Sequence, residues 1–246
     1  MVSADELRAV LGTGTGQSGF LLEEYLVDGS GHQQWTASYF SLESVVSAGR
    51  VSHVAFTGRF PLAEPFRETG NFIPALVPPS MRPEAIELVN RAIKALGILD
   101  AVIHTEIKVT PDGLRVIEVN GRLGGRPPFV LGSVSDVNLF EVSCHVAAGI
   151  PVAFDDLVEC DGVGFWLMLQ PPMTAERVAA VAGFDDIAAL DVIDIVRTNR
   201  APGDCVSWKD GTESHVISVR GRVTDHAALA DIIATIRRQV AIEYVP

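Results

Sequence analysis

Cysteine is scarce in this chain, and long apolar runs are missing. Only three cysteines occur among the 246 residues, far apart and without a C-x-x-C pair (Cys144, Cys160 and Cys205), so neither a disulfide framework nor a zinc knuckle is indicated. No apolar stretch approaches the roughly 20 residues that a membrane helix needs. The first residues are acidic where a secretory signal would be basic and then apolar. We therefore expect a cytoplasmic protein with no membrane partner.

Basic residues are also few. Lysine and arginine number 19 against 31 acidic residues, which gives a net charge of −12, and no basic cluster is present. A protein that follows a phosphate backbone needs such a cluster, so nucleic acid is not an expected partner. Apolar residues make up 48% of the chain and charged residues 20%, which excludes a disordered protein. The length suits one large domain, or one domain with a smaller lobe.

Residue patterning in the first part of the chain predicts an antiparallel sheet with flanking helices. The glycine-rich tract at 12–19 reads as a connector, because a phosphate-binding loop would end in Lys-Ser/Thr and open a helix, and a dinucleotide fingerprint would follow a strand. The predicted elements are a helix at 3–11, strands at 20–26 and 32–40, a hairpin at 45–57, a long proline-rich loop at 58–79, a helix at 80–96, strands at 101–109 and 114–120, and a helix at 137–148.

From about residue 156 the patterning suggests a second unit. The expected elements are strands at 162–169, 189–197 and 214–220 and helices at 174–182 and 224–241. The predicted fold class is α+β, with a large subdomain at 1–155 and a smaller C-terminal α+β lobe at 156–246.

The hairpin at 101–120 brings chemically important side chains together. Pro111-Asp112-Gly113 suits a three-residue loop, a type I turn followed by a left-handed glycine. That loop places Glu106 directly opposite Glu118, and His104 opposite Asn120. Side chains alternate between the two faces of a strand, so five polar residues share one face (His104, Glu106, Glu118, Asn120 and Arg122). The other face is apolar and should meet the core (Ile103, Ile107, Val109, Ile117 and Val119).

Two carboxylates that face each other across a hairpin destabilise it unless a positive charge lies between them. Magnesium fits best, because Glu106, Glu118 and the Asn120 amide supply the oxygen ligands that it accepts. His104 has no second histidine at ligand spacing and so argues only weakly for zinc. The alternative is that both acids face solvent and tolerate each other.

The residues after Asn120 suit an anion. Arg122 and Arg126 carry guanidinium groups that match phosphate and carboxylate oxygens. Gly124 and Gly125 allow the backbone to approach closely and to aim N–H groups at an anion. A metal, arginines and amide donors together describe a site for a transferred phosphoryl group.

Taken together, these motifs resemble a known superfamily. Glu106, followed by Glu118-Val-Asn120-Gly-Arg122-Leu-Gly124-Gly125, is similar to the metal and phosphate signature of the ATP-grasp superfamily, in particular its carboxylate–amine ligases, which include amino-acid ligases. The segment 21–29 resembles the strand and linker on which those enzymes lay the adenine. The resemblance runs from Val2 to about Glu243.

The resemblance implies an enzyme that phosphorylates a carboxylate with ATP and lets an amine attack the acyl phosphate. It assigns one or two Mg²⁺ ions to Glu106, Glu118 and Asn120, and it assigns the acyl phosphate to Arg122. Arg126, with the Gly124 and Gly125 amides, would hold the carboxylate. Glu23 and the Leu26 backbone would contact adenine, and His32 would reach the ribose, although a histidine beside a hairpin is more often a surface residue.

Two departures from the superfamily pattern bear on function. The chain begins after the substrate domain and lysine strands that usually come first, so we expect a fragment, a mis-started reading frame or a split subunit that needs a partner chain. A non-catalytic module and a homodimer stay open. In the proline-rich loop, Glu68-Thr-Gly-Asn71 stands where amino-acid ligases tend to show Glu-x-Gly-His. Glu68 and Asn71 are therefore expected to bind substrate, without a general base at Asn71.

Overall fold

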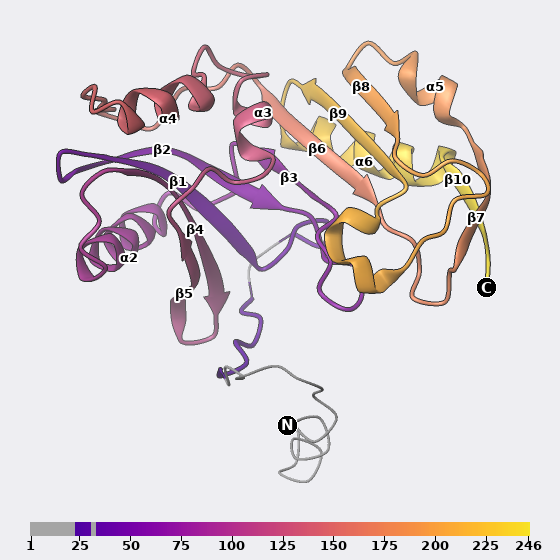
Figure 1. The fold of residues 1–246 in the computed structure, drawn as a ribbon, viewed down its shortest axis with the longest axis horizontal. Helices are drawn as coiled ribbons and strands as arrows, with labels where there is room; N and C mark the ends of the chain where they lie inside the picture. The colour runs from indigo at the N-terminus through magenta and orange to yellow at the C-terminus, as the bar shows by residue number, and fades with distance from the viewer. Residues whose placement is uncertain (1–22, 31–32) are drawn as a thin grey trace, which may run out of the picture.

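A computed structural model describes residues 23–30 and 33–246 of the chain (Figure 1). The helix expected at 3–11, the glycine-rich tract at 12–19 and the ribose candidate His32 lie outside the described residues. Within the described ranges, no helix is long and apolar enough to cross a bilayer.

One eight-stranded sheet runs through the molecule, and all of its pairs are antiparallel. Its order is β5-β4-β1-β2-β3-β6-β9-β8. The strands are β1 (Tyr39–Ser47), β2 (Arg50–Arg59), β3 (Gly70–Ile73), β4 (Ala101–Thr110), β5 (Gly113–Asn120), β6 (Val163–Leu169), β8 (Ile193–Thr198) and β9 (Ile217–Val223). The four-residue strand β3 pairs with β2 on one side and β6 on the other, so strands from both parts of the chain share one sheet.

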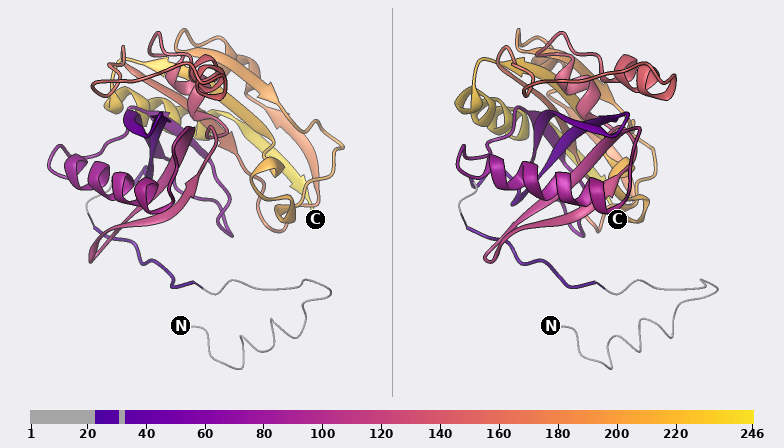
Figure 2. Two further views of the ribbon diagram at one scale, coloured as in Figure 1. Left: turned by 60° about the vertical axis from the view of Figure 1, so that its left-hand side comes forward. Right: turned by 90° about the vertical axis from the view of Figure 1, so that its left-hand side faces the viewer.

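Helices cover both faces of this sheet (Figures 1 and 2). On one face, α2 (Arg82–Ala95) buries Ala85, Val89 and Ile93 against β1, β2 and β4, and α6 (His226–Gln239) packs on β6 and β9. On the other face, α3 (Pro127–Leu131) and α4 (Leu139–Ala147) cover only part of the sheet. The part of that face formed by the ends of β1, β2, β4 and β5 carries the polar residues of the predicted site.

Several elements form where the sequence predicts them. The turn between β1 and β2 has positive φ at both Ala48 (50°) and Gly49 (75°), the conformation of a tight hairpin. Helix α2 has proline in its first turn and ends before Gly97, whose φ is 64°. The helix expected at 224–241 is α6, which begins after the side-chain cap Asp225.

The helix predicted at 174–182 is wrong. Residues Arg177–Ala182 form strand β7, which pairs with an unpredicted C-terminal strand, β10 (Ala241–Val245), in a second sheet of two strands. The alanine-rich sequence favours a helix locally, but pairing with β10 and the complete burial of Val178 in the core override that propensity.

Other differences concern short elements. Residues 23–30 contain no strand, and β1 begins only at Tyr39, so the hairpin expected from 20–26 and 32–40 does not form in the described residues. The predicted loops at 58–79 and after Asn120 contain β3 and α3. Helix α5 (Phe184–Ala188) and the 3₁₀ helix η1 (Trp208–Ser214) were not predicted either. Elements of four to seven residues depend on tertiary partners that local patterning does not reveal.

Candidate active site

The β4–β5 hairpin places the predicted acids opposite each other. Glu106 pairs with Glu118, and His104 pairs with Asn120. Nearer the turn the register differs from the prediction by one residue, because Thr110 pairs with Gly113. A β-bulge restores the predicted register beyond Ile107, and Ile117 is the extra residue on β5. The bulge is therefore what puts Glu118 and Asn120 on the same face as Glu106.

The bulge also changes the apolar face of the hairpin. Ile103 and Ile107 are buried in the core as predicted, and Val109 and Val119 pack against the same cluster. The prediction for Ile117 is wrong: its side chain is 41% exposed. An unpaired bulge residue leaves the regular alternation of a strand, so its side chain need not follow its neighbours into the core.

A positive charge does lie beside Glu106, and it belongs to Arg59 at the end of β2. The Arg59 Nη2 donates to Glu106 Oε1 at 2.9 Å, and Nη1 donates to Glu68 Oε1 at 2.7 Å. The Arg59 side chain is only 3% exposed, and its guanidinium lies 5.8 Å from the centre of the Tyr39 ring. Sequence reasoning missed Arg59. The only available signal was its alternation on β2, and that has no meaning before the strand order is known.

His104 forms a buried ion pair with Glu43 of β1, another residue that sequence reasoning missed. His104 Nδ1 lies 2.9 Å from both Glu43 carboxylate oxygens. The Ser41 and Thr57 hydroxyls also donate to Glu43 Oε1, each at 2.9 Å. Burial alone would lower the pKa of His104, but the Glu43 charge and hydrogen bonds to Glu106 and Glu43 raise that pKa to about 9. Because Glu43 and Glu106 engage both ring nitrogens of His104, this histidine does not fit the zinc ligand that the sequence suggested weakly.

The electrostatics keep Glu106 ionised. Burial would raise the pKa of the Glu106 carboxyl, but the hydrogen bond from His104 and the charges of Arg59, His104 and Arg122 lower it overall. Arg122 itself is exposed and donates from Nη1 to the Leu123 carbonyl at 2.9 Å. The charge of Arg122 thus acts on Glu106, and its role at a phosphoryl group stays a prediction.

The donor set of Glu106, Glu118 and Asn120 fits a hard divalent cation. Glu118 is exposed, and Asn120 Nδ2 donates to Glu118 Oε1 at 2.6 Å. Among the described residues, no group of three or more His, Cys, Asp or Glu side chains is arranged to hold a metal. A cation at this position would therefore rely on the Asn120 carbonyl oxygen as its third protein ligand, which is acceptable for magnesium.

The residues predicted to bind the substrates lie near Glu68 and Arg59. Arg126, at the N-terminus of α3, places Nη1 3.8 Å from Glu68 Oε2 and donates from Nη2 to Glu213 at 2.9 Å. Asn71 is opposite Arg59 in the β2–β3 register and is 1% exposed. Neither polar atom of the Asn71 side chain has a hydrogen-bond partner among the described residues.

The paired glycines have different surroundings. A Cβ on Gly124 would come within 2.9 Å of His104 Nδ1 and of a Pro127 ring carbon, so only glycine fits there without a shift. A Cβ on Gly125 would meet nothing within 4 Å in the described part of the chain. Gly124 is therefore required by close packing on His104, whereas Gly125 is not required for space.

A cleft of about 950 Å³ lies beside the hairpin. The segment 23–26, which contains Glu23 and Leu26, lines it together with Lys108, Ile117 and the loop at 61–66. Lys108 forms an ion pair with Asp28. On β4, Lys108 shares its face with Glu106, so the cleft and the acids lie on the same side of the sheet.

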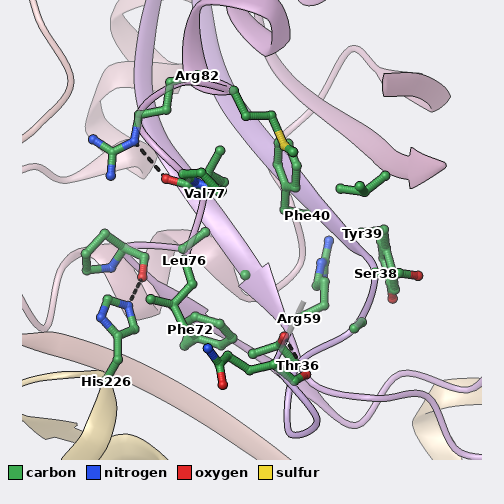
Figure 3. Close-up of a pocket in the computed structure, with 18 of the residues that line it drawn as sticks. Thr36, Ser38, Tyr39, Phe40, Arg59, Phe72, Leu76, Val77, Arg82 and His226 are labelled. Atoms are coloured by element: carbon green, nitrogen blue, oxygen red, sulfur yellow. Dashed lines mark hydrogen bonds between the residues drawn. The ribbon is translucent and has the colours of Figure 1, made fainter. Parts of the chain in front are cut away.

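A second cavity, of about 480 Å³, lies on the face covered by α2 and α6 (Figure 3). Phe40, Phe72, Val77 and His226 line it, and His226 Nε2 lies 2.8 Å from the Pro74 carbonyl oxygen. Neither Glu106 nor Glu118 lines this cavity. Neither acid lines the larger cleft itself, but Lys108 and Ile117 of the same hairpin do, so the candidate site is the larger cleft together with the acids beside it.

The chain has the ATP-grasp fold, which it shares with the solved structures that it resembles. It aligns with an L-amino acid ligase from Bacillus licheniformis at a TM-score of 0.73 and 17% identity, over 85% of this chain and 52% of that one. It also aligns with the biotin carboxylase domain of a Hydrogenobacter thermophilus 2-oxoglutarate carboxylase, a complex with MgADP, ADP and bicarbonate, at a TM-score of 0.58 and 16% identity, over 85% of this chain and 47% of that one.

The chain is also similar in sequence to a known protein. The chain is 30% identical to carnosine synthase 1 of Mus musculus over 148 residues, which is 58% of this chain and 16% of the relative. No family model matches the chain. The chain thus spans about half of the structures it resembles and less than a fifth of this carnosine synthase.

Proposed function

We propose that the chain is part of an ATP-dependent carboxylate–amine ligase that forms an amide bond through an acyl phosphate. The observation that carries the proposal is the pairing of Glu106 with Glu118, with Asn120 on the same face, beside a cleft large enough for a nucleotide. The substrate class is an amino-acid carboxylate and an amine, in keeping with the relatives named L-amino acid ligase and carnosine synthase.

In this proposal the cleft holds ATP. The segment with Glu23 and the Leu26 backbone contacts adenine, as the sequence resemblance implies, and Ile117, which also lines the cleft, offers an apolar contact. Lys108, on the same face as Glu106, supplies a positive charge toward the polyphosphate. The cleft is lined by apolar side chains, such as Leu26 and Ile117, and by charged ones, such as Lys108, which suits the amphipathic character of a nucleotide.

Glu106, Glu118 and Asn120 would hold one or two Mg²⁺ ions. The metal would supply charge neutralisation for the phosphoryl oxygens. Arg59 and His104 keep Glu106 ionised and orient its carboxylate, because both contact its Oε1 atom, at 2.9 and 3.4 Å.

The remaining residues act on the substrates. Arg126 and the Gly124 and Gly125 amides hold the carboxylate, whose oxygen attacks the γ-phosphorus as the bond to the ADP oxygen breaks. Arg122 neutralises the charge of the transferred phosphoryl group. The amine nitrogen then attacks the acyl carbon, phosphate leaves, and the nitrogen loses a proton. Glu68 binds the amine as an ammonium, with Asn71 beside it, and the ammonium gives up one proton to solvent before the neutral nitrogen attacks.

Calorimetric titration of the chain with MgADP tests this function. Glu106→Gln and Glu118→Gln should each weaken binding at least about tenfold, because each removes one charged ligand of a shared cation. Glu141→Gln, on an exposed carboxylate of α4, is the matched control and should bind like the parent. If both site variants bind MgADP as tightly as the control, the function is wrong.

A second measurement tests the substrates. Phosphate release from ATP is followed with a panel of amino acids, with and without the coding region upstream of this chain. Release that needs an amino acid and is lost in Arg122→Ala supports the ligase. Tight MgADP binding without release under either condition would instead indicate a nucleotide-binding module.

A further inference from the structure

Arg59 is shared by two acids that have different roles in the proposed function. Its Nη1 donates to Glu68, the proposed amine-binding residue, at 2.7 Å, and its Nη2 donates to Glu106, the proposed metal ligand, at 2.9 Å. We propose that Arg59 is a positioning residue that couples these acids, so that Glu68 supports cation binding at Glu106 through Arg59. The proposal rests on the proposed function, because that function assigns the roles of Glu68 and Glu106.

The surroundings of Arg59 restrict it to this bridging position. Its side chain is 3% exposed, and Nε is buried with no partner among the described residues. Its two terminal nitrogens therefore make its hydrogen bonds, one to each acid. Nη2 also lies 3.0 Å from His104 Nε2. The Tyr39 ring 5.8 Å away adds a cation–π contact but no counter-charge.

The buried charge of Arg59 explains why Glu68 and Glu106 depend on each other. Removing one partner from a buried ion pair is costly, because it leaves an uncompensated charge in a poorly solvated position. When a cation binds Glu106 it competes with Arg59 for the same carboxylate. Glu68 then becomes the remaining partner of the guanidinium, and its negative charge lowers the cost of transferring Glu106 to the cation.

Neighbouring groups do not replace Glu68 in this role. Glu43 is engaged by His104, Ser41 and Thr57. Arg126 is a second cation at 3.8 Å from Glu68, and Glu213 balances it at 2.9 Å. Without Glu68, the guanidinium would remain on Glu106 and oppose the incoming cation.

Mn²⁺ binding to the full chain, measured by electron paramagnetic resonance, tests the coupling in a double-mutant cycle. Glu68→Gln should weaken Mn²⁺ binding at least about fivefold in the parent, the lower end of typical coupling between sites. In an Arg59→Gln background, the same change should weaken it less than about twofold. Glu87→Gln, on an exposed carboxylate of α2 on the opposite face, controls for the loss of one negative charge.

Arg59→Lys provides the second background, because it keeps the buried charge that folding needs, while one ammonium cannot reach both acids as the planar guanidinium does. The effect of Glu68→Gln should be below about twofold there too. An equal effect of Glu68→Gln in the parent and in Arg59→Lys would overturn the coupling while leaving the ligase intact. Failure of the parent itself to bind Mn²⁺ in a Glu106-dependent way would instead overturn the proposed function, and the coupling with it.

Discussion

Glu43 and His104 form a buried ion pair on the face of the sheet that carries Glu106, with 2.9 Å between His104 Nδ1 and each Glu43 oxygen. Both side chains are 5% exposed. Glu43 is opposite His104 in the β1–β4 pair, and His104 lies two residues before Glu106 on the same face of β4. The ion pair is therefore next to Glu106. The residues of the candidate site are therefore supported by a buried ion pair and not by apolar packing alone.

The ion pair predicts a pH-dependent stability. The pKa of His104 is raised from 6.5 to about 9 in the folded chain, so its contribution is fully present below pH 6.5 and is lost as pH rises to about 9. The loss should reach up to about 3 kcal/mol, because stability falls by about 1.4 kcal/mol for each pH unit between these two values. Urea unfolding in EDTA at several pH values measures it.

The control for this experiment is another histidine. His104→Gln should flatten the fall in unfolding free energy between pH 6.5 and 9, whereas His145→Gln, at a half-buried position of α4, should retain it. An unchanged slope in His104→Gln would show that other groups cause the pH dependence.

The paired glycines give a second prediction. Gly124→Ala should cost about 1 to 3 kcal/mol of unfolding free energy, because its Cβ would lie 2.9 Å from both His104 Nδ1 and Pro127 Cγ. The displaced imidazole should also show a smaller pH effect on stability. Gly125→Ala is the matched control, with no atom of the described residues within 4 Å of its Cβ. Equal stability of the two variants would mean that the chain relaxes around Gly124 without cost.

Asn71 gives a third prediction, in which stability and binding move in opposite directions. Asn71→Leu removes a buried carboxamide whose two polar atoms have no partner in the described structure, and it keeps the branched shape of the side chain, so unfolding free energy should rise by about 1 kcal/mol. Binding of the amine substrate should weaken, because a hydrogen-bonding group beside Glu68 is lost. Urea unfolding and calorimetry measure the two effects.

Asn90 on α2 offers the contrasting case. Its Oδ1 lies 3.1 Å from His53 Nε2, so Asn90→Leu should lower stability by about 1 kcal/mol or more. A fall in stability for Asn71→Leu similar to that for Asn90→Leu would contradict the structural argument.

The sequence was sufficient for the hairpin because its information is local. Alternation along β4 and the turn residues Pro111-Asp112-Gly113 were enough to predict that Glu106 faces Glu118. The simple turn model reached the correct register only because the bulge at Ile117 compensates for the pairing of Thr110 with Gly113. Bulges have no clear local signal, so the exposure of Ile117 could not be predicted.

Arg59 and Glu43 could not be assigned from the sequence, because their roles depend on strand order. Arg59 meets Glu106 only because β1 lies between β2 and β4, which no local pattern specifies. The same reason accounts for β7, where pairing with the distant strand β10 overrides a helical sequence.

Ile117 gives the last prediction, since the bulge turns an apolar side chain into the proposed nucleotide cleft. Ile117→Glu should leave unfolding free energy within about 0.5 kcal/mol, because the position is 41% exposed. It should weaken MgADP binding at least about tenfold, because it replaces an apolar contact with a negative charge that repels the polyphosphate. Leu99→Glu makes the same change at a 65% exposed position after α2, away from the cleft, and should bind like the parent. Parent-like binding by Ile117→Glu would place the nucleotide elsewhere on the chain.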